Sequence, residues 1–153
     1  MIKELCDILT GLVFFLQQAH LCADNKSYAA HLLTENLQKS VHKDIDALKE
    51  LYILSTGDYS IANAQESLHE SAKQLRVFLQ NYPLKTNEDV LRCCVGLEQW
   101  AYDKAAEASA FYADEGKELQ YAKAIVAVAD DVCKHRTHDL YLLRTEVFQN
   151  GNS

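Results

Sequence analysis

Two histidines and two carboxylates of this chain have types and spacings that suit a metal ion. His20 and His31 stand on either side of a run of turn-forming residues; Asp46 follows His31 by 15 positions, and Glu50 follows Asp46 by four. Imidazole nitrogens together with carboxylate oxygens form a mixed ligand set that suits iron, among other metals. These four residues are therefore the candidate site, and the next question is which elements position them.

Long helices are the elements that the sequence predicts. The 153 residues include one proline and five glycines, the two residue types that helix interiors exclude. Apolar residues recur at spacings of three and four in five segments. The predicted helices cover residues 3–23, 28–54, 60–80, a segment capped by Thr86 that ends near residue 113, and 117–148.

The second predicted helix carries a polar face opposite its apolar stripe. Spacings of three and four place six residues on this face: His31, Glu35, Gln38, His42, Asp46 and Glu50. The simplest interpretation is a solvated face, which every long surface helix has. That interpretation does not account for His20, which lies on the preceding helix beside the turn.

The length of this helix limits how a metal could be held. His31 and Asp46 are 15 residues apart, or about 22 Å along a helix that rises 1.5 Å per residue. One chain cannot bring both residues to the same ion. If they share a site, Asp46 must come from a second subunit that packs antiparallel across a two-fold axis, and this symmetry generates two identical sites.

In this pattern the chain resembles the Dps-type mini-ferritins, the DNA-protection-during-starvation proteins. That family has two histidines about a dozen residues apart, an aspartate 15 residues after the second and a glutamate four residues later. The stretch Asp46-Ala47-Leu48-Lys49-Glu50, the aromatic Tyr28 and the turn Tyr82-Pro83-Leu84 are similar as well. Departures from the family pattern are Leu21 and Cys22 after the first histidine, and Leu51 after the glutamate.

The resemblance implies an all-α fold, a ferritin-like four-helix bundle with an extra crossover helix, residues 60–80, between the second and third bundle helices. It also implies that His20 and His31 of one subunit and Asp46 and Glu50 of its partner bind ferrous iron. Peroxide or dioxygen would oxidise the iron in a ferroxidase reaction. The ferric product would be stored in a hollow homo-oligomer, a dodecamer built from two-fold dimers.

Composition and charge limit the classes of partner that the single predicted domain, residues 1–153, is expected to bind. The net charge is −7, which works against binding to nucleic acid or to an anionic membrane surface. We therefore expect no DNA condensation. No apolar run approaches the roughly 18 residues of a membrane span. The five cysteines form no C-x-x-C pair, which favours buried thiols in a reducing, cytoplasmic environment.

Two alternatives stay open from the sequence. Ferritin-like proteins of another kind hold two irons inside one bundle with paired Glu-x-x-His motifs. This chain has one such motif, Glu66 to His69, and the last helix offers only Asp131, His135 and His138; we expect His69 and His135 at the surface. The other alternative is a non-enzymatic helical-bundle interaction protein whose histidines are incidental.

Overall fold

The structure is a computed structural model that describes residues 2–22, 28–62, 73, 76, 77, 80 and 87–151. Within these ranges every regular element is a helix and no strand occurs. These elements are α1 (Ile2–Cys22), α2 (Tyr28–Thr56), the short 3₁₀ helix η1 (Tyr59–Ala62), α4 (Asn87–Ala113) and α5 (Ala122–Gly151). The all-helical prediction is confirmed for this part of the chain.

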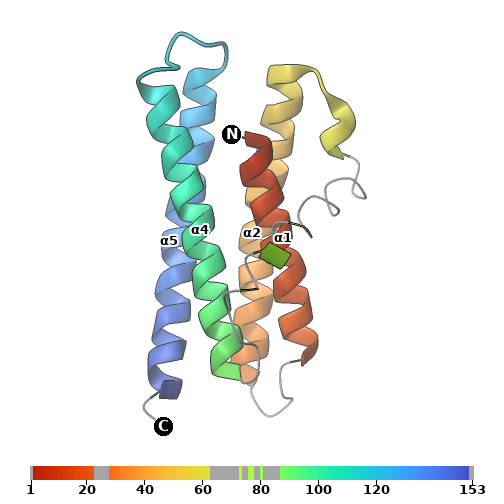
Figure 1. The fold of residues 1–153 in the computed structure, drawn as a ribbon, viewed down its shortest axis with the longest axis vertical. Coiled ribbons are helices and arrows are strands. Elements are labelled where there is room, and N and C mark those ends of the chain that lie inside the picture. The colour runs from red at the N-terminus through yellow and green to blue at the C-terminus, as the bar shows by residue number, and fades with distance from the viewer. Residues whose placement is uncertain are drawn as a thin grey trace.

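The four long helices form a bundle of two antiparallel hairpins, α1 with α2 and α4 with α5 (Figure 1). Further packing joins α1 to α4 and α2 to α5. Each long helix therefore has two main neighbours, as at the corners of a square. This arrangement buries one stripe of each helix and leaves its opposite side to solvent.

One connection of the bundle must run along its whole length. Helix α2 ends near the end of the bundle that holds the N-terminus, whereas α4 begins near the opposite end (Figure 1). The two helices are therefore parallel, and the chain between residues 57 and 86 crosses from one end of the bundle to the other. The described part of this connection begins with η1; most of the predicted helix 60–80 lies outside the described residues.

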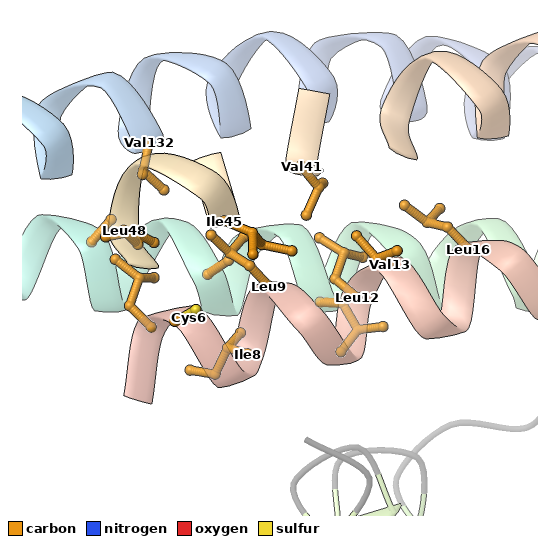
Figure 2. Close-up of a cluster of buried hydrophobic side chains, with 14 of the residues drawn as sticks. Cys6, Ile8, Leu9, Leu12, Val13, Leu16, Val41, Ile45, Leu48 and Val132 are labelled. Carbon is orange, nitrogen blue, oxygen red and sulfur yellow. The ribbon is translucent and has the colours of Figure 1, made fainter. Parts of the chain in front are cut away.

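Apolar side chains from all four long helices meet in the interior of the bundle. Figure 2 labels some of those from α1, α2 and α5. Leu9 and Leu12 of α1, Val41 of α2 and Val132 of α5 have no exposed surface. Full burial of such a side chain stabilises the fold by about 1.5–3 kcal/mol each. The apolar stripes that the sequence predicts for these helices are thus the surfaces that hold the bundle together.

The end of α2 is fixed by a glycine, as the sequence predicts. Gly57 has a φ of 72°, and its N–H donates to the carbonyl of Ile53 at 2.8 Å. A left-handed residue at this point satisfies a carbonyl of the last helical turn. Asp58 then accepts a hydrogen bond from the Ser60 N–H at 2.9 Å and another from the Tyr52 hydroxyl at 3.2 Å. These bonds start η1 directly after α2.

Helix α5 begins later than predicted, at Ala122 instead of residue 117. A series of turns occupies the difference: the Leu119 N–H donates to Gly116 and the Ala122 N–H donates to Leu119. Gly116 is packed against Phe111, where an added Cβ would lie 2.8 Å from a ring carbon. Tyr121 has a φ of 66°, which no α-helical residue adopts.

Candidate functional site

The backbone places all four candidate residues on the α1–α2 hairpin. His31, Asp46 and Glu50 lie on α2, which runs unbroken over 29 residues, so the separation of about 22 Å between residues 31 and 46 holds. His20 lies near the end of α1, and His31 lies near the start of α2. The side chains of both histidines lie outside the described part of the structure, and their role as ligands stays a prediction.

Asp46 and Glu50 form an exposed pair of carboxylates, one helical turn apart on α2. Neither makes an ion pair or a side-chain hydrogen bond within the described residues. Like charges at this spacing destabilise a helix by a few tenths of a kcal/mol. His42, one turn before Asp46, is exposed as well. The polar face of α2 therefore presents side chains that could bind a metal ion. No cationic side chain in the described part of the same chain forms an ion pair with the two carboxylates.

A large apolar side chain lies exposed next to this pair. Leu54, one turn beyond Glu50 on α2, is 60% exposed. Large apolar groups around polar ones are a common composition for surfaces that contact another protein. The stretch of α2 that holds the carboxylate pair thus has a feature of an interface.

The buried cysteines of the described part of the chain do not add ligands to this site. Cys6, Cys93 and Cys94 are free and buried, as predicted. Burial raises the pKa of the Cys6 thiol to about 11, with a smaller rise from the charge of Asp46, and burial raises the pKa of Cys93 to about 12. Because metals bind the thiolate, these protonated thiols are poor ligands at neutral pH.

A second polar group, which the sequence analysis missed, lies inside the bundle. Arg136 of α5 has no exposed surface and contacts three buried carboxyl groups, one from each of α2, α4 and α5. Its Nη1 lies 3.0 and 3.1 Å from the two oxygens of Glu98 and 3.1 Å from Asp139 Oδ2. Its Nη2 donates to Asp44 Oδ2 at 3.0 Å and to Ser40 Oγ at 2.9 Å. We call these five residues the interior cluster.

The interior cluster has more carboxyl groups than cations. Burial raises the pKa of Glu98 to about 8, and the charges of Asp139 and Asp44 add to the rise against the opposing effect of Arg136. Burial also raises the pKa of Asp139. Glu98 is therefore largely protonated at pH 7, which lowers the number of charges that the bundle interior has to hold.

His135 joins this cluster from the outside. Its side chain is 40% exposed, as expected of a surface histidine, and its Nδ1 also lies 2.7 Å from Oδ1 of the buried Asp44. A carboxylate only accepts hydrogen bonds, so the Nδ1 of His135 carries the proton. Asp44 is thus held between a histidine at the bundle surface and an arginine in the interior.

The interior cluster bears on the hypothesis of two irons inside one bundle. The guanidinium of Arg136 fills the space between the three carboxyl groups, where an interior cation would sit. Within the described ranges, no three histidine, cysteine or acidic side chains converge as metal ligands. Glu66 and His69 lie outside those ranges, and Asp131 and His138 are exposed. The described interior thus forms an ion cluster and supplies no metal centre.

The sequence did hold a signal for the interior cluster. Asp44 follows Val41 by three positions and precedes Leu48 by four, so it falls on the buried stripe of α2. Arg136 follows the buried Val132 by four positions on α5 in the same way. Charges of opposite sign on the apolar stripes of different helices predict a buried ion pair, because a lone charge there is too costly.

Two further observations complete the description of the chain. Among the described residues, no helix is both long and apolar enough to cross a membrane. Comparison of the chain with family models, with curated proteins and with solved structures gave no match.

Proposed function

We propose that this chain is the subunit of a Dps-type mini-ferritin, which binds ferrous iron as its substrate at a site shared by two subunits and oxidises it. The observation that carries the proposal is the exposed pair Asp46 and Glu50 on α2. The pair has no cationic partner among the described residues, and the same helix holds His31 about 22 Å away. Only a second copy of the chain can bring these groups together.

The connectivity of the bundle supports the same proposal. Helices α2 and α4 are parallel, with one connection that runs the length of the bundle (Figure 1). One long crossover is typical of ferritin-like folds, whereas cytokine-like bundles have two and simple up-and-down bundles have none. A ferritin-like bundle with residues 60–80 as its crossover helix agrees with this topology.

The proposed reaction follows from the charges of the four residues. The carboxylates of Asp46 and Glu50 from the partner subunit neutralise the two positive charges of Fe(II), and His20 and His31 supply neutral nitrogen ligands. Four protein ligands leave coordination positions open to peroxide or dioxygen. The iron loses an electron to the oxidant, and the ferric product collects inside a hollow oligomer of, by the family resemblance, twelve subunits. A net charge of −7 per chain attracts Fe(II) to such a shell.

Stopped-flow oxidation of Fe(II) tests this proposal. The double variant Asp46→Asn/Glu50→Gln keeps the size of both side chains and removes both charges. We expect it to lose most of the protein-dependent rate with peroxide and with dioxygen, and to keep its native mass, because the amides keep the size and shape of the side chains they replace. Glu35→Gln is the matched control, since it removes one carboxylate from the same face of α2. Wild-type rates in the double variant would refute the site.

A further inference from the structure

We infer that a cavity between α2 and α5 binds a small oxyanion of the phosphate class. The cavity has a volume of about 360 Å³ and is lined by Lys39, Ser40 and Lys43 of α2 and by His135 of α5. This volume lies at the lower end of the range for sites that hold small molecules. Lys39 and Lys43 precede Asp46 by seven and three positions, so the cavity lies beside the proposed iron site on α2, but the inference rests on different side chains.

The charge of the lining residues selects an anion. Lys39 and Lys43 lie one helical turn apart, and two like charges at this spacing repel each other. Lys39 has a weak counter-charge in Glu35, at 3.7 Å between two exposed side chains. Lys43 makes no ion pair within the described residues. The two lysines bring positive charge to this cavity, although the chain as a whole has a net charge of −7. An anion bound between them would reduce their repulsion.

Hydrogen bonds to buried groups hold two of the four lining residues, Ser40 and His135. Ser40 Oγ accepts a hydrogen bond from Arg136 Nη2 at 2.9 Å, and His135 Nδ1 lies 2.7 Å from the buried carboxylate of Asp44. Arg136 in turn holds Asp44 at 3.0 Å. The imidazole is therefore fixed through its Nδ1, and its Nε2 either accepts the O–H of a hydrogen phosphate or, in the protonated ring, donates to a phosphate oxygen. A ring held in this way binds without a large loss of side-chain entropy.

The geometry favours a small anion over a nucleic acid. Binding to a nucleic-acid backbone needs a basic face that contacts many phosphates, and each contact adds to the affinity. Here the basic groups converge on one cavity, within a strongly acidic chain. One phosphate group, either free or as a phosphomonoester, matches the lysines and the fixed histidine.

Calorimetric titration of the full chain with inorganic phosphate tests this inference. We expect wild type to bind phosphate and Lys43→Gln to bind it about tenfold more weakly, because a hydrogen bond to a charged group is lost. Lys134→Gln is the matched control: it removes the same charge from α5 at an exposed position outside the cavity lining, and we expect its affinity to equal that of wild type.

His135→Gln and a second ligand complete the test. We expect His135→Gln to weaken phosphate binding as Lys43→Gln does, with helical content unchanged by circular dichroism. Glycerol phosphate distinguishes the source: tighter binding than inorganic phosphate indicates a phosphomonoester, and equal binding indicates the phosphate group alone. The inference is wrong if wild type does not bind either ligand, or if Lys43→Gln and Lys134→Gln weaken binding equally, since a non-specific charge effect would then explain the result.

Discussion

Replacing Arg136 with methionine is the sharpest test of the interior cluster. Methionine has a similar length and is accepted in a bundle core, but it brings no charge and no hydrogen-bond donor. In the variant Arg136→Met, the carboxyl groups of Asp44, Glu98 and Asp139 lose the guanidinium that lies 3.0–3.1 Å from each of them. The perturbation therefore leaves buried acidic groups without their shared cation.

The size of the effect follows from the burial of these groups. Removing one partner of a buried ion pair costs about 3–5 kcal/mol, a large part of the roughly 5–15 kcal/mol that stabilises an ordinary domain. The variant Glu98→Gln should cost much less at pH 7, about 0.5–1.5 kcal/mol, because Glu98 is largely protonated there and the amide keeps its shape. The contrast between the two variants depends on the protonation state that we assign to Glu98.

The two variants should also differ in their dependence on pH. In the folded chain the pKa of Glu98 is raised to about 8 from 4.5, so between these values the folded state binds more protons than the unfolded state. The free energy of unfolding of wild type therefore falls as pH rises through this range, by up to about 1.4 kcal/mol per pH unit. Glu98→Gln should flatten this slope. Arg136→Met should be more destabilised at pH 8 than at pH 5.5, since protonation neutralises the stranded carboxyl groups.

Urea unfolding followed by circular dichroism at pH 5.5, 7 and 8 measures these differences. One protein concentration is used throughout, because any association of subunits adds to the apparent stability. The reasoning would be refuted if Arg136→Met lost less than about 1 kcal/mol at pH 8, or if Glu98→Gln kept the wild-type slope with pH. The first result would mean that the guanidinium does not stabilise charged carboxylates inside this bundle, and the second would mean that the raised pKa of Glu98 is not the cause of the slope.

Two other predictions concern packing and thiol chemistry. Leu12→Ala, at a side chain with no exposed surface, should cost about 2–5 kcal/mol in urea unfolding, whereas Phe14→Ala on the outer side of α1 should cost less than half as much; equal costs would contradict the packing in Figure 2. Cys6 and Cys93, with thiol pKa values raised by burial to about 11 and 12, should react with a disulfide reagent at pH 8 far more slowly in the native chain than in urea; rapid labelling of the native chain at these two positions, mapped by mass spectrometry, would refute their burial.

The sequence predicts the helices well because their apolar stripes are long and regular. The stripe of α1 and the glycine that ends α2 are local signals, and local signals decide where these helices pack and stop. The start of α5 was predicted five residues too early, at residue 117, because the turn depends on the contact between Gly116 and Phe111 and on the positive φ of Tyr121. Neither feature is visible as a hydrophobic pattern.

How well the sequence predicts the surroundings of a polar group depends on whether one helix or several helices determine them. The exposure of Asp46 and Glu50 follows from their place on α2 opposite its apolar stripe, and the sequence was enough to predict it. The interior cluster joins Asp44, Glu98 and Arg136 across three helices, and only the packing of those helices brings the charges together. The place of each residue on the apolar stripe of its helix indicates that it is buried, but not which charges it meets.

Complementation between two inactive variants tests the central claim, a site shared by two subunits, most directly. One variant carries His20→Ala and His31→Ala, and the other carries Asp46→Ala and Glu50→Ala. In a two-fold dimer of one chain of each kind, one of the two sites receives all four native residues. Equal co-expression makes half of the dimers mixed, so about one quarter of all sites are intact.

The measurement is the rate of Fe(II) oxidation by the co-expressed oligomer. We predict about one quarter of the wild-type rate from the mixture, with neither variant active alone. A mixture that stays as inactive as its components would contradict the shared site.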